Sequence, residues 1–284
     1  MNQIYRIKQH LSSAIATTLL LAVFMMPQTT FADNLKCTVL DICYCVTPKF
    51  EKEITANVKK VREQLKKHRE KGEFVAYISI PLTSQGGGDN TLDQEVSESI
   101  YNELMKKYGK GFWALAPGVK GGPRLPDAAT DGDWMYMWTQ ILAGENGLGE
   151  DFDAVFFTGP ESFLSHMGAS GNNVIEQLRK FAKNRATQLT TTHELMFPKF
   201  NKKISQQGAM REFIDNYAFR SSVAFSEGCH DEWNIFHAIN RNRLANKKYG
   251  IIKQLPVFFD GKAVAPSAYA TPISAGAQNV CSPL

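Results

Sequence analysis

Short apolar runs alternate with amphipathic segments along the chain, and this alternation constrains the fold most strongly. The runs are 74–80 (FVAYISI), 112–117 (FWALAP) and 152–160 (FDAVFFTGP), with a shorter one at 255–261 (LPVFFDG). Runs of this kind are typical of strands that are buried on both faces of a sheet. Strands that alternate with helices form a mostly parallel sheet. The sequence therefore predicts an α/β fold with an open, doubly wound, mostly parallel sheet and helices on both faces.

The segments between the runs carry apolar residues at helical spacing. In 50–71, Ile54, Val58, Val61 and Leu65 recur three or four positions apart, with Lys and Glu between them, which indicates an amphipathic helix. Further helices are expected at 92–109, 133–142, from 172 onward, 209–219 and 231–244, and a strand at 221–225. The segments 161–172 and 262–284 are expected to be irregular.

The first 32 residues have the pattern of a secretory signal peptide. Arg6 and Lys8 precede the apolar run AIATTLLLAVFMM, and TFA precedes Asp33. The run is short for a membrane span. We expect a mature chain, 33–284, that is exported to the periplasm or secreted and has no membrane association after signal removal. An uncleaved membrane anchor is the alternative. In the mature chain we expect a cysteine-containing segment and helix (33–73), an α/β domain (74–261) and a tail (262–284).

Charge and cysteine content narrow the classes of partner and cofactor. The formal net charge is +4 without a long basic run, so nucleic acid is not expected as a partner. The five cysteines are Cys37, Cys43, Cys45, Cys229 and Cys281. Export favours disulfides that staple the termini to the body, with the odd cysteine left as a free thiol or an intermolecular bond. Cys43 and Cys45 resemble half a metal site, but no second close pair completes it. No metal or other cofactor is therefore expected.

In an open α/β sheet, ligands bind beyond the carboxyl ends of the strands, where three polar loops would meet. The first is glycine-rich, and its candidate ligand-binding residues are Thr83, Ser84, Gly86, Gly87, Gly88, Asp89 and Asn90. A helix that starts near Thr91 would point free N–H groups at this loop and favour an anion; a mobile connection is the alternative. The second loop carries Asp127, Asp131 and Asp133, and the third carries Glu161, Ser162, Ser165 and His166. Asp133 is also suited to capping its helix.

Two of these stretches, AYISIPLTSQGGGDN and FDAVFFTGPESFLSHMGASG, together resemble the nucleoside 2-deoxyribosyltransferase-like superfamily over about residues 75–185. This resemblance implies a Rossmann-like fold in which Tyr77 and the 83–90 loop hold the sugar or phosphate and Asp133 is an acidic helper. The family nucleophile is a Glu that follows the third loop, and here the nearest match is Glu176. It comes eight residues after Gly168, farther than the family spacing. Its alternative role is that of a solvated helix residue.

A second polar cluster, SEGCHDEWNIFH (226–237), lies at a helix start. His230 and Asp231 are candidate catalytic residues there, as the centre of an unrelated hydrolase. His230 and His237 are two helical turns apart and share a face. They could hold a metal only with a third ligand such as His193, so capping and packing roles are the alternative.

Two classes of function follow. The first is an exported enzyme that cleaves or transfers at the N-glycosidic bond of a nucleoside, nucleotide or related ribosyl compound. It requires a carboxylate, from Glu176, Asp133 or Glu161, within reach of the glycine-rich loop. The second is an exported, non-catalytic ligand-binding or interaction protein on the same fold. In both, the expected partner is a small nucleoside- or nucleotide-like molecule.

Overall fold

The structure is a computed structural model, and it describes residues 34–82, 88–119, 122–188, 206–221, 226–246, 253–265 and 281. All of these belong to one compact unit. The predicted signal peptide, 1–32, lies outside the described residues, as do residues 222–225 of a predicted strand. None of the helices described is both long enough and apolar enough to cross a membrane.

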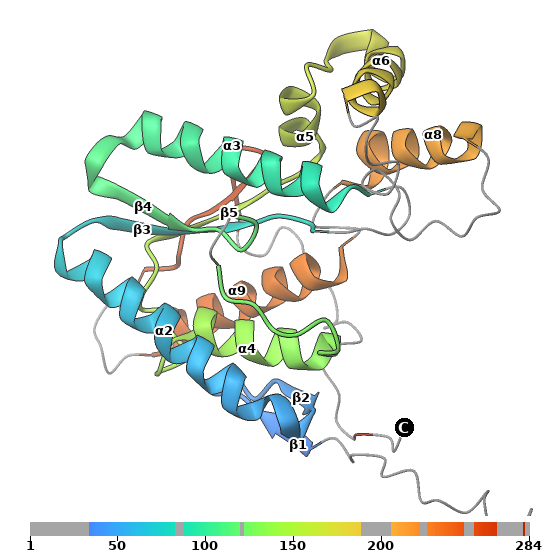
Figure 1. The fold of residues 1–284 in the computed structure, drawn as a ribbon. Helices are drawn as coiled ribbons and strands as arrows, with labels where there is room; N and C mark the ends of the chain where they lie inside the picture. Colours follow the sequence, from blue (N-terminus) through green and yellow to red (C-terminus); the bar gives the residue numbers. More distant parts are fainter. Residues whose placement is uncertain are drawn as a thin grey trace, which may run out of the picture. The chain divides into compact units, whose positions relative to one another are not determined.

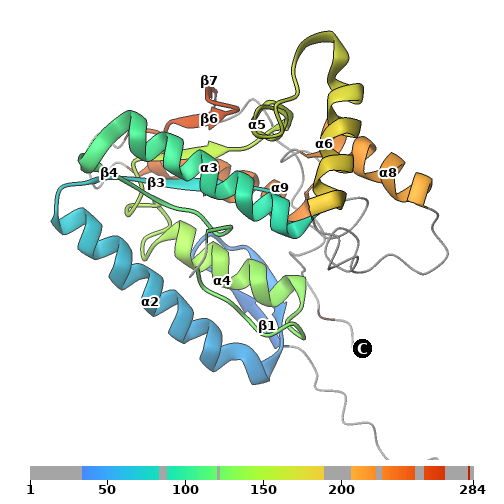
Figure 2. The same cartoon turned by 45° about the horizontal axis from the view of Figure 1, so that its top comes forward.

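A five-stranded sheet with the order β4-β3-β5-β6-β7 lies between the helices (Figures 1 and 2). Its strands are β3 (Phe74–Ser79), β4 (Phe112–Leu115), β5 (Ala154–Phe157), β6 (Val257–Phe259) and β7 (Lys262–Val264). The first four are parallel, and β7 pairs antiparallel with β6. The predicted α/β fold with a mostly parallel sheet is therefore confirmed.

Helices cover both faces of this sheet (Figures 1 and 2). On one face lies α3 (Asn90–Tyr108), and on the other lie α2 (Glu51–Glu70), α4 (Asp131–Ala143) and α9 (Glu227–Ala245). Successive side chains of a strand point to opposite faces. Accordingly, Ala76 and Phe156 pack in the cluster that borders α3, whereas Tyr77 and Phe157 pack in the cluster of α2, α4 and α9. This alternation sets which strand residues can reach α9.

Several short helices connect β5 to α9. They are α5 (Pro160–His166), η3 (Gly171–Asn173), α6 (Val174–Gln188), α8 (Gln206–Asp215) and the π-helical η4 (Asn216–Arg220); η1 (Pro48–Phe50) and η2 (Gly109–Gly111) are single turns elsewhere. The expectation that 161–172 is irregular is wrong for α5. The Asp260 carboxylate caps this helix, because it accepts hydrogen bonds from the N–H groups of Gly159, Glu161 and Ser162 at 2.8–3.1 Å. A cap from so far along the chain leaves no local sequence signal.

The predicted tail also contains a strand. Asp260 and Gly261 have φ values of 46° and 73°, as an Asp-Gly hairpin turn requires, and β7 folds back on β6 through this turn. The expectation of an irregular segment from 262 is therefore wrong for Lys262–Val264. The Asp-Gly pair between two apolar runs was the available signal.

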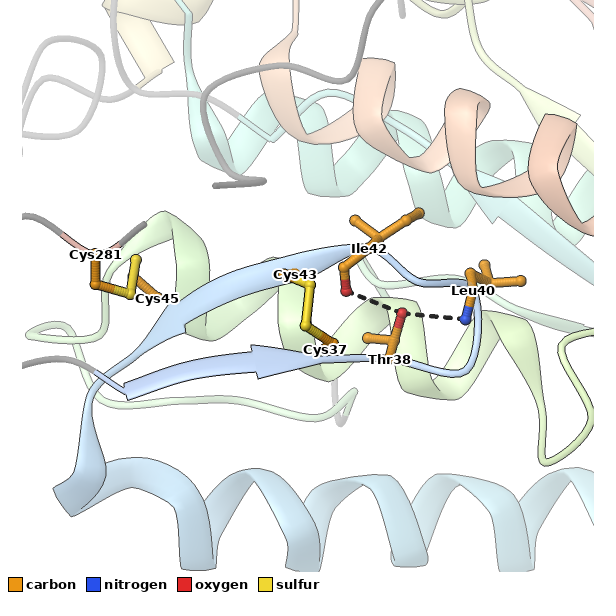
Figure 3. The surroundings of a disulfide bond; sticks show 7 residues. All are labelled: Cys37, Thr38, Leu40, Ile42, Cys43, Cys45 and Cys281. Carbon is orange, nitrogen blue, oxygen red and sulfur yellow. Dashed lines mark hydrogen bonds between the residues drawn. A yellow bond between two sulfur atoms is a disulfide. The ribbon is translucent and has the colours of Figure 1, made fainter. Parts of the chain in front are cut away.

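A disulfide-bonded hairpin precedes α2. Its strands, β1 (Asn34–Cys37) and β2 (Cys43–Val46), pair with Cys37 opposite Cys43, and these two cysteines form a disulfide. Cys45 forms a second disulfide with Cys281 (Figure 3), whereas Cys229 is a buried free thiol. The Thr38 hydroxyl closes the turn by donating to the Ile42 carbonyl at 3.1 Å. The prediction of disulfides is confirmed, and the bonds indicate folding in an oxidising compartment outside the cytosol.

The hairpin packs so closely on the start of α4 that Gly132 has no room for a side chain. A Cβ at this position would lie 2.5 Å from the Cys45 carbonyl oxygen, which belongs to backbone and cannot swing away. We expect Gly132→Ala to lower the free energy of unfolding by about 2–3 kcal/mol, as overpacking does. Urea denaturation of the oxidised protein would measure this.

The matched control is Gly228→Ala, because Gly228 also lies in the first turn of a helix. The nearest atom to a Cβ there is the Met135 sulfur at 3.9 Å, so this variant should be as stable as the wild type or more stable. Equal unfolding midpoints for Gly132→Ala and the wild type would show that the hairpin is not seated on α4 as described.

Candidate functional site

The strand order changes direction between β3 and β5. The chain runs from β3 through α3 to β4 on one side, and then returns through α4 to β5 on the other side of β3. Ligands of open α/β sheets bind beyond the carboxyl ends of the strands at such a point. Here those ends are Ser79 of β3 and Phe157 of β5.

One buried carboxylate stands directly at this position. The Glu232 side chain, on α9, accepts a hydrogen bond from the Tyr77 hydroxyl at 2.7 Å and another from the Ser79 hydroxyl at 2.5 Å. Glu232 is 7% exposed, and Tyr77 and Ser79 are fully buried. Both carboxylate oxygens are therefore held by the carboxyl end of β3.

Local structure explains this arrangement. Tyr77 and Ser79 are two positions apart on one strand, so their side chains point to the same face of the sheet. The Tyr77 ring packs against Trp138, Phe152 and Phe236, with centroids 5.7–6.1 Å apart. Phe236 lies one helical turn after Glu232. The same apolar packing that fixes α9 therefore fixes the carboxylate.

Burial changes the acidity of Glu232. Its pKa is raised from 4.5 to about 7, because desolvation and the neighbouring Asp231 charge, which both raise it, outweigh the hydrogen bonds from Ser79 and Tyr77, which lower it. A carboxyl group with a pKa near the working pH exists in both protonation states and can donate or accept a proton. Glu232 is thus suited to general acid–base chemistry.

The same shift makes the stability of the protein depend on pH. Between pH 4.5 and about 7 the folded state binds the Glu232 proton and the unfolded state does not, so this contribution to stability falls as pH rises. We expect the stability of the wild type relative to Glu232→Gln to fall by about 3 kcal/mol across this window. Urea unfolding of both proteins at several pH values would measure it. A difference that stays constant with pH would show that Glu232 titrates normally.

The thiol beside this carboxylate is not a nucleophile at neutral pH. Burial raises the pKa of Cys229 far above its ordinary value, the charge of Glu232 raises it further, and hydrogen bonds to Ser79 and Ser226 act in the opposite direction. The reactive form of cysteine is the thiolate. Cys229 therefore remains a neutral neighbour of the site.

A second buried polar cluster lies at the start of α3. The Asp89 carboxylate accepts hydrogen bonds from the N–H groups of Thr91 and Leu92 at 3.0 and 3.2 Å, and it pairs with Arg185 at 2.9 Å. Arg185 also binds Glu95 through two hydrogen bonds. The cluster joins α3 to α6, and Asp89 takes up the N–H groups that a bound anion would have used.

A groove of about 360 Å³ lies between α3 and α5, beside the ends of β5 and β6. The predicted ligand-binding residues Glu161, Ser162 and Ser165 line it together with His166. Ser162 donates to Asp260 at 2.7 Å, and Glu161 pairs with Lys262 at 3.0 Å. Burial lowers the pKa of His166. Two of the three predicted residues therefore have protein partners of their own.

The predicted catalytic residues are dispersed. The Asp133 carboxylate forms a capping box with Thr130 and accepts hydrogen bonds from the backbone and hydroxyl groups of Thr47. Glu176 is 72% exposed on α6, where it pairs with Arg179 at 2.7 Å. Asp231 is buried next to Glu232, and His230 is half-buried one residue earlier. Of the predicted catalytic residues, only His230 and Asp231 adjoin Glu232 in the chain.

The predicted ligand-binding residues divide in the same way. Tyr77 contacts Glu232 directly, Gly88 and Asp89 are buried at the start of α3, and Asn90 is exposed as its first residue. Thr83, Ser84, Gly86, Gly87 and His193 lie outside the described residues. The described residues contain no group of three His, Cys, Asp or Glu side chains placed to hold a metal ion.

Sequence reasoning missed Glu232 as a site residue. The signal was its position, since Glu232 precedes Phe236 by four residues and Ile239 by seven, which places it on the apolar face of the helix. A glutamate on a buried helix face requires hydrogen-bond partners. Tyr77 and Ser79 could supply them, because they lie two positions apart on a buried strand and their hydroxyl groups point to the same face of the sheet.

Comparisons of the chain with protein-family models, with curated proteins and with solved structures found no match. None of them identifies the nucleoside 2-deoxyribosyltransferase-like superfamily. The resemblance over about residues 75–185 therefore remains a hypothesis from sequence motifs.

Proposed function

We propose that this protein is an exported enzyme, periplasmic or secreted, that cleaves or transfers at the N-glycosidic bond of a nucleoside-like compound. The observation that carries the proposal is the buried Glu232 carboxyl group, held by Tyr77 and Ser79 at the carboxyl end of β3. We assign it the role of general acid–base residue. The protein's own groups supply this chemistry without a cofactor.

The chemistry of Glu232 suits this bond. Cleavage at an anomeric carbon passes through an oxocarbenium-like state and is aided by proton donation to the leaving group. A carboxyl group with a pKa of about 7 can donate that proton in its neutral form, and in its ionised form it can stabilise the positive centre or activate water. Tyr77 and Ser79 keep the carboxyl group in one orientation throughout.

The choice of the N-glycosidic bond rests on the sequence resemblance. The resemblance implies that Tyr77 helps to hold the sugar or phosphate, and Tyr77 is one of the two residues that donate a hydrogen bond to Glu232. In the family pattern the nucleophile is a Glu after the third loop. In this chain we assign the carboxylate role to Glu232 instead, because Glu176 is exposed and paired with Arg179.

A non-catalytic ligand-binding protein is the second candidate. The observation that favours it is that both oxygens of Glu232 already have donors, which join α9 to β3. In that case the carboxylate would stabilise the packing of the two elements, and the ligand would be bound without being changed.

Base release distinguishes the two candidates. The mature protein would be incubated with a panel of nucleosides, nucleotides and NAD, and free base would be followed by chromatography. We expect release from at least one compound, at a rate that Glu176→Gln leaves unchanged within about twofold, because exposed charges contribute little. Binding of a panel compound without release would establish the ligand-binding candidate. A large loss in Glu176→Gln would return the role to Glu176.

A further inference from the structure

Four helices begin on the carboxyl side of the sheet, and the chain caps each of them with its own side-chain oxygens. α3, α4 and α5 follow β3, β4 and β5, and α9 brings Glu232 to Ser79. In α/β folds, phosphate groups bind at these helix starts, because unpaired N–H groups and the helix dipole attract anions. The side chains that accept hydrogen bonds at the four helix starts therefore indicate which ligand charge the site can accept.

Carboxylates cap two of these starts, and at α4 a carboxylate completes the cap that the Thr130 hydroxyl makes. Asp89 caps α3, Asp133 completes the capping box of α4, and Asp260 accepts three N–H groups at the start of α5. Ser226 caps α9, and Asp231 and Glu232 follow in its second turn. Asp89, Asp133 and Asp231 are at most 2% exposed. An anion at any of the first three starts would have to displace a negatively charged side chain.

Two described cations bind carboxylates at these starts. Arg185 is 12% exposed and binds both Asp89 and Glu95, and Lys262 binds Glu161. The helix starts themselves therefore carry mostly carboxylates, and like charges of this kind disfavour an anionic ligand at the starts.

We infer that the site excludes phosphorylated ligands and takes an uncharged or cationic one. This inference rests on the proposed function for the location of the site, and it narrows the substrate class from nucleosides and nucleotides to nucleosides. It reverses the expectation of an anion at the glycine-rich loop, because Asp89 holds the N–H groups that would have bound it.

Calorimetry with the mature oxidised protein tests anion exclusion without requiring turnover. The probes are inorganic phosphate, pyrophosphate, a nucleoside such as adenosine, and the same nucleoside as its 5′-monophosphate. We expect no detectable binding of phosphate or pyrophosphate at millimolar concentration. The monophosphate should bind at least about tenfold more weakly than the nucleoside, since its negative charge meets the carboxylates of the helix starts.

Charge-removing variants locate the effect. Asp89→Asn keeps a good helix cap but removes a charge and leaves one side of Arg185 available, so the monophosphate should gain about tenfold relative to the nucleoside. Asp260→Asn makes the same change at α5 and serves if Asp89→Asn does not fold. Glu70→Gln is the control, because it removes an equal charge away from the four helix starts. Glu70 is the last residue of α2 and pairs there with Lys66.

The outcomes separate this inference from the proposed function. Tight binding of phosphate, or a monophosphate that binds or reacts as well as the nucleoside, would overturn the inference and leave the enzyme proposal intact. Absence of base release, together with absence of phosphate binding, would overturn the enzyme proposal and support anion exclusion. An equal gain in Asp89→Asn and Glu70→Gln would assign selectivity to net charge and overturn the role of the capped helix starts.

Discussion

Glu232→Gln should lower kcat/KM for base release by about 10²–10⁴-fold, the usual contribution of a general acid–base residue. Glutamine has the same shape and can still accept a hydrogen bond from Tyr77 or Ser79, but it cannot gain or lose a proton at neutral pH. The loss should therefore occur in a protein that remains folded. Circular dichroism and thermal unfolding of the variant at pH 7 would establish this.

Two neighbouring substitutions sharpen the assignment. The hydrogen bonds from Tyr77 and Ser79 lower the pKa of Glu232, so Tyr77→Phe and Ser79→Ala should move the titration of the rate to higher pH while they retain much of the activity. A purely structural role would not move the pH profile. Retention of activity within about threefold in Glu232→Gln would contradict the acid–base role, because loss of a general acid–base residue lowers the rate by about 10²–10⁴-fold.

Loss of the Cys45–Cys281 disulfide should have the largest effect on stability. This bond joins residues 236 positions apart, whereas Cys37–Cys43 spans six. In the chain-entropy model, stabilisation grows with the logarithm of the loop length, which gives about 5 kcal/mol for the long loop and about 2 kcal/mol for the short one. We expect Cys45→Ala with Cys281→Ala to unfold at much lower urea concentration than the wild type.

The short disulfide provides the matched control. Cys37→Ala with Cys43→Ala also replaces two bonded cysteines, here one in β1 and one in β2, and it should lower the free energy of unfolding by less than half as much. Urea denaturation of both double variants under oxidising conditions would compare them. A larger loss from the hairpin pair would show that local hairpin structure, rather than closure of the long loop, accounts for the stabilisation.

Much of the fold could be predicted, because it is written in local periodicity. Apolar runs located β3, β4, β5 and β6, and helical spacing located α2, α3, α4 and α9. The elements that were missed have other determinants. Asp260 caps α5 from about a hundred residues away, and β1 and β2 are short strands with mixed burial. Neither leaves a periodic pattern.

The candidate site was harder to predict for the same reason. Glu232 and Tyr77 are 155 positions apart, and their contact depends on how α9 crosses the sheet. Sequence reasoning expected the site at the carboxyl edge of a parallel sheet and included Tyr77, but it named His230 and Asp231 rather than their neighbour Glu232. It also treated Asp89 as a ligand contact, whereas its carboxylate caps α3. Residue type could not separate these roles.

A crystal structure of the mature protein with a non-hydrolysable nucleoside analogue would test the central assignment most directly. We expect the analogue at the carboxyl ends of β3 and β5, with its glycosidic position within hydrogen-bonding reach of the Glu232 carboxyl group, directly or through one water. An analogue bound in the groove between α3 and α5, with Glu232 still enclosed by Tyr77 and Ser79, would contradict it.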